Sequence, residues 1–483
     1  MKNKAISLVL LLSMLLVSQS CGEAATDGGD ATVSDDVTTA APETDYIETL
    51  GEEDFGGAEF VILAHEAEAF PNLGSGELTG DPVNDALYKR EQDISELYNV
   101  TIVHDGPSDR GVLKNNLQNS VLAGDEAYQL VMTSMADGIN TLMPNGILYE
   151  LNSLPSLDLS NEWWNQNLNR NLNFSGKVYT ATGPICRVYY NTPMVTAFNT
   201  QLCENYGFEN LYDVVESGKW TIDKFGELMK VGTEDLNGDG IYDDTDRYAL
   251  LLDDEDGKAL FVSAGGKLTE IAEDGSYYLD LASEKNLSLL DRLVGIFGDR
   301  STSYHVPSLD ATTEKMFMES RSTFVIISIG NIISHFRDMQ ADYGIIPMPK
   351  ADESQEDYIT YGNPWFASGV AVPANCSTPE MTGLVMEALA YISHRDLVPA
   401  IYDVTLQEKL TRDEKSKTML DLIYRDIYFD LNSIYNFGDS ANKLRLAAVG
   451  SATTSFATTW ASIEAAAKSA LNEIVEAEAI AGE

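Results

Sequence analysis

Short apolar segments alternate with helical patterns along the chain, and this alternation constrains the fold more than any other sequence feature. Residues 59–66, 100–105 and 128–135 are apolar runs of the length typical of buried strands. The segments 81–99 and 111–125 lie between them and carry apolar side chains at helical spacing. Strands that alternate with helices predict a doubly wound α/β lobe.

The second half of the chain continues the pattern. Strands are predicted at 247–253, 322–331 and 343–349, and helices at 219–235, 378–393 and 457–479. The stretch GKVYTATGPICRVYYN (176–191) predicts two strands separated by a Gly-Pro break, as in a crossing between lobes. A chain of 483 residues without an internal repeat is long enough for two lobes.

The N-terminus has the order of an export signal. Two lysines among the first four residues precede the apolar run 5–17, which is too short to span a bilayer comfortably, and Cys21 follows soon after. We predict a signal peptide over 1–20 and lipidation of Cys21, as in a bacterial lipoprotein. Ser18 departs from the usual lipoprotein signal, so plain signal cleavage with an incidental Cys21 stays an alternative.

An acidic segment follows the signal. Residues 22–54 contain no basic residue and few large apolar ones, so they cannot bury enough surface to fold. We therefore predict that 21–55 form a lipid-anchored cysteine and a disordered acidic linker. Because no later run reaches the length of a membrane helix, we predict an exported protein, held by its lipid at the extracellular face of the cell membrane.

The charge balance narrows the classes of partner. The chain has 31 basic and 76 acidic residues and a net charge of -45. Such a charge repels nucleic-acid phosphates and anionic lipid headgroups, so we predict no binding to either.

Three cysteines remain after Cys21, namely Cys186, Cys203 and Cys376. A Cys186–Cys203 disulfide and buried free thiols both stay open.

Residues 235–246 have the spacing of a calcium loop. The candidate ligands, at positions 1, 3, 5, 7, 9 and 12 of such a loop, are Asp235, Asn237, Asp239, the carbonyl of Ile241, Asp243 and Asp246. A predicted strand rather than a second helix follows, and no second loop pairs with this one. We therefore predict a structural Ca²⁺ that tightens one lobe, with a solvated acidic turn as the alternative.

The sequence shows no catalytic signature. It lacks a GxSxG elbow, a Walker loop and a GxGxxG turn after a strand, and its five histidines have no zinc spacing. Aromatic residues do stand beside polar ones in irregular segments, at Trp163 and Trp164, at Tyr189 and Tyr190, and at Trp365. Pockets for polar small molecules, sugars among them, combine such groups, although each ring also suits a local core.

Eight stretches together resemble a known family. They are VNDALYKRE (83–91), NEWWNQN (161–167), GKVYTATG (176–183), ESGKWTIDKFGELMK (216–230), DLNGDGIYDDTDRYAL (235–250), YGIIPMPKADESQEDY (343–358), LVPAIYD (397–403) and LTRDEKSKTMLDLI (410–423). Their order and spacing resemble the extracellular solute-binding proteins (family 1) of ABC importers, in the group with maltose-type sugar binders, and most closely their lipoprotein members.

The resemblance implies an α/β fold of the periplasmic-binding-protein type II, with mixed sheets flanked by helices and a hinged cleft. One lobe would hold 56–186 and 366–430, and the other 187–365 and 431–480. The residues expected to bind ligand are Glu66, Ser134, Trp164, Tyr190, Asn331 and Trp365.

The resemblance also implies a function. We expect a monomeric binding lipoprotein that is not an enzyme. It would capture a carbohydrate, with an oligosaccharide as the favoured ligand, and deliver it to the permease subunits of an ABC transporter in the membrane. The alternatives are an exported, lipid-anchored carbohydrate-active enzyme resembling glycoside hydrolases, and a binding protein for a peptide or polyamine.

Overall fold

The computed structural model describes residues 45–67, 71–308, 310–407 and 414–480. The predicted signal peptide, Cys21 and the greater part of the acidic linker lie outside these residues. None of the helices in the described part of the chain combines the length and the apolar character that a bilayer span requires.

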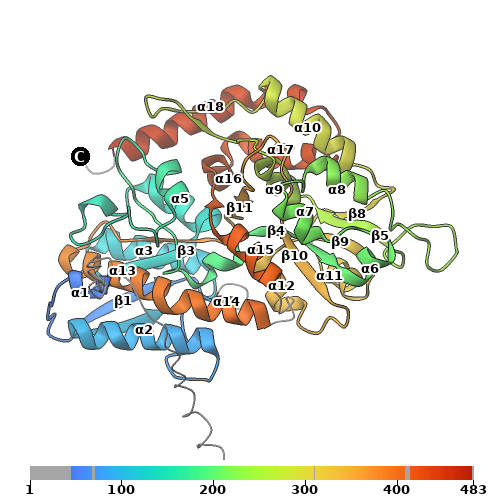
Figure 1. Cartoon of the computed structure of the whole chain (residues 1–483). Helices are drawn as coiled ribbons and strands as arrows, with labels where there is room; N and C mark the ends of the chain where they lie inside the picture. The colour runs from blue at the N-terminus through green and yellow to red at the C-terminus, as the bar shows by residue number, and fades with distance from the viewer. Residues whose placement is uncertain (1–44, 68–70, 309, 408–413, 481–483) are drawn as a thin grey trace, which may run out of the picture. The chain divides into compact units, whose positions relative to one another are not determined.

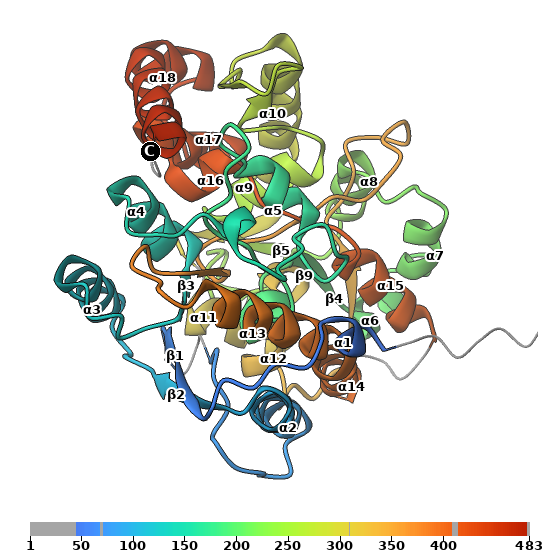
Figure 2. The ribbon, with the colours of Figure 1, turned by 90° about the vertical axis from the view of Figure 1, so that its left-hand side faces the viewer.

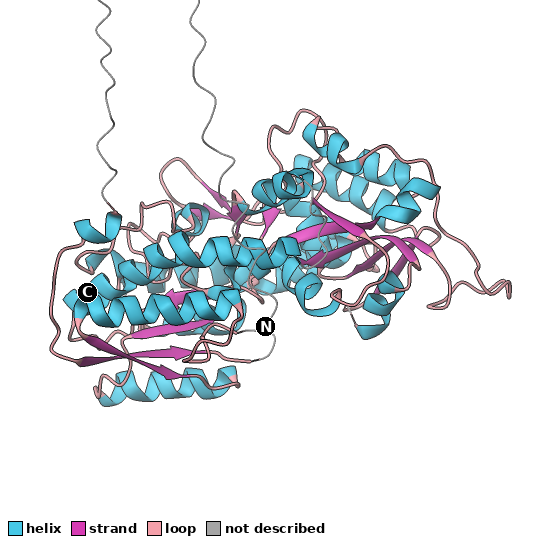
Figure 3. Ribbon diagram, turned by 60° about the horizontal axis from the view of Figure 1, so that its bottom comes forward, coloured by secondary structure: helices cyan, strands magenta, loops and turns pink. Residues whose placement is uncertain are grey.

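The first sheet has four strands, three of them parallel. In spatial order they are β12 (Ser368–Ala371), β3 (Leu130–Ser134), β1 (Ala58–Ala64) and β2 (Val100–Asp105). β1 pairs in parallel with β2 and β3, whereas β12 runs antiparallel to β3. Every residue of β3 is buried, as expected for a strand covered on both faces. Figure 3 shows these strands between helices on both sides.

The helices of this lobe begin and end where their capping residues stand. The Asp81 carboxylate accepts the Asn84 N–H at 2.7 Å and starts α2 (Pro82–Tyr98). The Asp109 carboxylate does the same for α3 (Arg110–Ala123), which ends at Gly124 with a φ of 67°. The predicted strands and helices of the first 135 residues are therefore confirmed, with ends that lie within two residues of the predicted ones.

The second sheet has five strands. In spatial order they are β10 (Tyr343–Pro347), β4 (Met194–Asn199), β9 (Ser322–Ser328), β5 (Tyr248–Asp253) and β8 (Ser303–Val306). β5 is parallel to β8 and β9, and β4 is antiparallel to β9 and β10. The chain passes from the first sheet to the second before β4 and returns between β10 and β12, as Figure 1 shows by colour.

The helices and the minor strands complete the fold. They are α4 (Asn140–Leu142), α5 (Gln166–Asn171), α6 (Thr200–Asn205), α7 (Leu211–Glu216), α8 (Ile222–Leu228), α9 (Asp256–Ser263), α10 (Glu284–Phe297), α11 (Ala311–Met318), α12 (Ile329–His335), α13 (Pro379–Ile392), α14 (Val398–Gln407), α15 (Glu414–Tyr424), α16 (Leu431–Tyr435), α17 (Ser440–Ala448) and α18 (Phe456–Ile480), with the two-stranded pairs β6 (Glu270–Ile271)–β7 (Tyr277–Tyr278) and β11 (Thr360–Tyr361)–β13 (Ile427–Tyr428).

The C-terminal helices divide between the two sheets. α13 and α14 pack on α2 of the first lobe, whereas α15 packs on β10 of the second sheet. The range 366–430, predicted to belong to the first lobe, thus contributes to both. α17 packs on α9 and α10. α18 packs on α17, on β7 and on η2 (Met143–Asn145), so it contacts segments of both lobes.

Two predicted elements differ from the structure. Residues 176–191 do not form two strands; they contain single bridges and the 3-10 helix η4 (Arg187–Asn191). The reason is that the backbone here pairs with separate segments, since the Ala181 N–H donates to Val370 and the Thr182 carbonyl accepts from Asn165. The helix predicted over 219–235 is only α8, because Gly232 turns the chain with a φ of 102°.

The three cysteines that the structure describes are free thiols. Cys186 and Cys203 are buried and unpaired, and Cys376 is half-buried and also free. Burial raises the pKa of both Cys186 and Cys203 to about 12, so both stay protonated at neutral pH. The disulfide that the sequence left open does not form.

The prediction of a disordered linker up to residue 55 was wrong for residues 45–55. They include the short helix α1 (Tyr46–Thr49), which lies against α13 in Figure 2. The Tyr46 ring packs on Trp163 with 4.7 Å between centroids, and its hydroxyl donates to the buried Glu387 carboxylate at 3.1 Å. Trp164 donates to the same carboxylate through its indole N–H, also at 3.1 Å.

We expect Tyr46→Ala to lower the free energy of unfolding by about 1–3 kcal/mol, because it removes a half-buried ring and one donor to a buried carboxylate. Urea unfolding measures the change. Tyr278→Ala, at an exposed ring on β7, serves as the control and should have little effect. Equal stability of both variants would mean that α1 is not docked in solution.

Candidate functional site

A cavity of about 720 Å³ lies where the two lobes face each other. Its walls come from the start of α2, from η4, from the turn between β9 and α12, and from α14. The lining residues are Pro71, Asp81, Val83, Arg187, Val188, Asn191, Ser328, Gly330, Asn331, Ile333, Ser334, His335, Arg337, Phe366, Ile401 and Val404. A volume of this size is typical of sites for small molecules.

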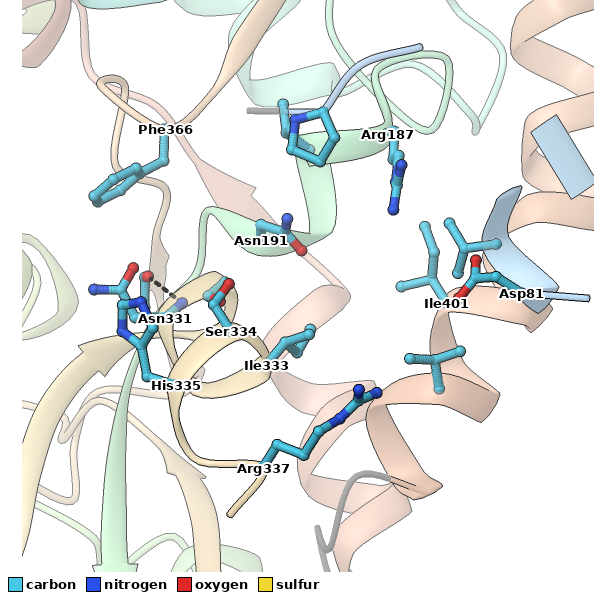
Figure 4. Close-up of a pocket in the computed structure, with 16 residues that line it drawn as sticks. Asp81, Arg187, Asn191, Asn331, Ile333, Ser334, His335, Arg337, Phe366 and Ile401 are labelled. Carbon is cyan, nitrogen blue, oxygen red and sulfur yellow. Dashed lines mark hydrogen bonds between the residues drawn. The ribbon is translucent and has the colours of Figure 1, made fainter. Parts of the chain in front are cut away.

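Polar and apolar groups share the cavity wall. Figure 4 shows Asn191, Asn331 and Ser334 beside one another at one side, with Phe366 above them. Asp81 and Ile401 lie at the opposite side, on elements of the first lobe. A ring with a flat apolar face, together with amides and a hydroxyl, matches the surface of a polyhydroxylated molecule.

The turn from β9 into α12 positions Asn331. The Ser328 hydroxyl accepts the Asn331 N–H at 3.2 Å and caps the helix, as the dashed line in Figure 4 marks. Gly330 lets this turn approach η4 closely, because a Cβ there would stand 2.9 Å from the Cβ of Asn191. This close approach brings η4, which carries Asn191, next to the turn that carries Asn331.

Charged groups lie in the cavity wall and next to it. Burial lowers the pKa of Arg187, and the negative charges of Asp81 and Glu66 oppose that change. Burial raises the pKa of Glu66, and the N–H groups of Leu73 and Asn72 oppose that rise by donating to its carboxylate at 3.0 and 2.9 Å. His335 is paired with the Glu314 carboxylate.

Of the residues predicted to bind ligand, Asn331 lines the cavity. Tyr190 is buried beside η4, with its ring 4.9 Å from that of Tyr424 and 6.4 Å from that of Tyr402, measured between centroids. Its neighbours Arg187 and Asn191 line the cavity instead. The predicted Tyr190 side chain thus lies in the core, and residues close to it in the sequence line the cavity.

The other four predicted ligand residues do not line this cavity. The Glu66 carboxylate accepts the Asn72 N–H at 2.9 Å, and the buried Ser134 hydroxyl donates to the backbone carbonyls of Pro364 and Trp365 at 3.3 Å each. The Trp365 side chain is 42% exposed but lies outside the lining, whereas the next residue, Phe366, belongs to it.

Trp164 is a core residue. Its side chain is buried, and its indole N–H donates a hydrogen bond to the Glu387 carboxylate within the first lobe. The alternative that the sequence left open for each aromatic residue, a place in the local core, holds for this one. No composition rule separates such a ring from one in a cavity, because both stand next to amides in the sequence.

The predicted calcium loop is closed by its own hydrogen bonds. The Asp235 carboxylate accepts the N–H groups of Gly238 and Gly240 at 2.6 and 2.9 Å. The buried Asp246 carboxylate accepts those of Leu236 and Asp243 at 2.9 and 3.1 Å.

The remaining side chains of that loop are also engaged. Asn237, Asp239 and Asp243 each accept the N–H of the residue two positions on. Across the described ranges, no group of three or more acidic, His or Cys side chains is arranged to hold a metal ion. Calcium binding by this loop therefore stays a prediction.

Comparisons with known proteins place the fold. No protein-family model matches the chain, and no curated protein matches it by sequence. A solved cyclo/maltodextrin-binding protein complexed with maltotetraose is similar with a TM-score of 0.54 and 15% identity, over 89% of this chain and 97% of that one. The protein has the two-lobed periplasmic-binding-protein fold. The predicted fold class, with mixed sheets flanked by helices, is confirmed.

Two further structures support the periplasmic-binding-protein fold. An ABC substrate-binding protein from Listeria monocytogenes in complex with cycloalternan has a TM-score of 0.50 and 14% identity, over 87% of this chain and 98% of that one. An ABC transporter solute-binding protein from Thermotoga lettingae bound with α-D-tagatose has a TM-score of 0.52 and 13% identity, over 87% and 100%. At these identities the likeness establishes the fold.

We expect Gly330→Ala to lower the free energy of unfolding by about 1–3 kcal/mol, because the new methyl group would press α12 away from η4. Gly295→Ala on α10 is the matched control, since nothing lies within 4 Å of its Cβ position and alanine favours the helix. Chemical denaturation of both variants measures the difference. A Gly330→Ala protein as stable as the control would contradict the close contact at the crossing.

Proposed function

We propose that the protein is the substrate-binding component of an ABC importer and captures a carbohydrate, an oligosaccharide, in the cavity between its lobes. The observation that carries the proposal is the cavity itself, which has amides, a hydroxyl and the Phe366 ring around about 720 Å³. Three solved proteins of the same fold hold saccharides, namely maltotetraose, cycloalternan and tagatose. These ligands belong to those proteins, and their common chemistry favours a saccharide here.

The fold supplies the mechanism. A ligand that touches Asn331 on one lobe and Asp81 on the other contacts both sides only when the lobes approach each other. Binding therefore stabilises the closed form, because the ligand has more contacts there. Closure excludes water and strengthens each hydrogen bond to the sugar. The closed form then docks on a membrane permease.

In this proposal the N-terminus determines where the protein is located. A signal peptide over 1–20 and a lipid on Cys21 would tether the folded part to the outer face of the membrane. The linker of this tether ends near residue 44, since the structure places Asp45 and Tyr46 against the first lobe.

The enzyme alternative has less support. Glycoside hydrolysis ordinarily needs two carboxyl groups that face the scissile bond. Asp81 is the single acidic side chain among the described residues that line the cavity. Its carboxylate already caps α2. A peptide or polyamine ligand is the remaining alternative.

We expect a saccharide to raise the melting temperature in a screen that includes glycans, amino acids and polyamines, since a ligand that binds only the native state stabilises it by mass action. Phe366→Ala should weaken binding of the same saccharide about tenfold, because a stacking contact contributes on the order of 1 kcal/mol or more. Tyr278→Ala is the control with unchanged affinity.

Two results would contradict the proposal. One is stabilisation by amino acids or polyamines but by no saccharide. The other is release of new reducing ends when the protein is incubated with a glycan.

We also propose that the 235–246 loop binds a structural Ca²⁺. The support is the ligand spacing together with Gly240, whose φ of 77° allows the turn that such a loop needs. We expect calcium to raise the melting temperature of EDTA-treated protein and to leave saccharide affinity unchanged. The shift should vanish in Asp235→Asn and persist in Asp274→Asn, the same substitution in another acidic turn. A shift that is absent, or that survives Asp235→Asn, would contradict calcium binding here.

A further inference from the structure

Arg187 is a cation at the cavity wall that has no direct partner among the described residues. Its side chain extends from η4 into the cavity in Figure 4, and no hydrogen bond or ion pair holds it within the described part of the chain. A guanidinium carries five N–H donors. Taking a charge out of water without a partner is costly, so an unpaired and half-buried guanidinium needs an explanation.

The other arginines show how unusual this is. Ten of them donate at least one hydrogen bond within the protein: Arg90, Arg110, Arg170, Arg247, Arg292, Arg300, Arg321, Arg395, Arg425 and Arg445. The chain has 76 acidic residues against 31 basic ones, so carboxylate partners are abundant. Among the carboxylates that the structure describes, none lies at ion-pair distance from Arg187.

The nearest negative charges do not occupy its donors. Asp81 and Glu66 both act on Arg187 through space. The Asp81 carboxylate accepts the Asn84 N–H, and the Glu66 carboxylate accepts those of Asn72 and Leu73. These two groups favour the charged form of the guanidinium and leave its N–H groups directed at the cavity.

Apart from Asp81, the described lining offers no anion. Asn191, Asn331 and Ser334 are neutral, and neither His335 nor Arg337 can carry a negative charge. Closure of the lobes would remove more water from Arg187. Neutral hydroxyl groups would then leave its charge uncompensated, whereas a carboxylate matches the planar guanidinium with two parallel hydrogen bonds.

We infer that the ligand is an acidic saccharide whose carboxylate binds Arg187. This inference rests on the proposed function and names the class of sugar, a uronate-containing oligosaccharide, that the cavity selects. Asn191, Asn331 and Phe366 contact the neutral part of the ligand, and Arg187 discriminates the acid from its uncharged analogues.

The test compares each acid with its own methyl ester. Oligomers of galacturonate, glucuronate and mannuronate, and their methyl esters, have the same rings and linkages but differ in charge. Isothermal titration of the full exported chain should give an affinity for one of the acids at least tenfold above that for its ester. Neutral malto-oligosaccharides and sugar phosphates complete the panel.

Variants of Arg187 connect the preference to this side chain. Arg187→Gln should lower the affinity for the acid tenfold or more and change the affinity for the ester less than threefold. Arg187→Lys keeps the positive charge but cannot form the two parallel hydrogen bonds of a guanidinium to a carboxylate. This variant should therefore lose part of the preference for the acid over its ester. Arg425→Gln, at an exposed ion pair with Asp357, is the control without effect. Melting temperatures without ligand show that each variant is folded.

The outcomes separate the inference from the proposed function. If neutral saccharides bind and no uronate does, or if Arg187→Gln binds the acid as tightly as the unchanged protein, the inference is overturned and the saccharide assignment stands. Binding of sugar phosphates in place of uronates overturns the assignment to a carboxylate. If no saccharide of any kind binds, the proposed function falls and the inference falls with it.

Discussion

The pairing of β12 with β3 is the constraint on which the rest of the structure depends. It brings Ser368 opposite Ser134, although more than 200 residues separate them in the chain. The Ser368 carbonyl accepts the Thr182 hydroxyl at 2.7 Å, and its hydroxyl accepts the Asn72 amide at 3.1 Å. The start of β12 thus contacts β3 and the segments that hold Asn72 and Thr182. These contacts bring the two connections between the sheets close together. Phe366, which precedes β12, and η4 therefore border the same cavity.

Two helix caps fix the position of parts of the cavity wall. Asp81 and Ser328 end their loops as capping residues of α2 and α12, and both line the cavity. A capping side chain is held by backbone N–H groups, so its position follows from the helix rather than from the ligand. The cavity therefore has a prearranged rim on both lobes, and the side chains next to these caps, Val83 and Asn331, are presented with it. Arg187 differs from them because no group of the described protein holds its donors.

The N-terminal segment shows why composition misled the prediction for residues 45–55. The rule for disordered segments averages over a window, and the acidic and small residues before residue 45 dominate that average. Tyr46 alone reverses the outcome locally, because its ring meets Trp163 and Tyr391 and its hydroxyl meets a buried carboxylate. Those partners lie more than 100 residues away, so no local window contains them.

The sequence by itself determined the class of fold, because the period of apolar residues is a local property that survives without tertiary contacts. The runs that became β1, β2, β3, β5, β9 and β10, and the capped helix α2, could all be located from it. Only the tertiary structure decided which side chains face the cavity. Of the predicted residues, Asn331 lines the cavity, whereas Tyr190 and Trp164 lie in the core; the lining residues Arg187, Asn191 and Phe366 were not predicted. Arg187 and Asn191 lie within three residues of the predicted Tyr190 in the sequence, and Phe366 directly follows the predicted Trp365. The direction of a side chain there depends on backbone pairing between distant segments, which spacing along one chain does not encode.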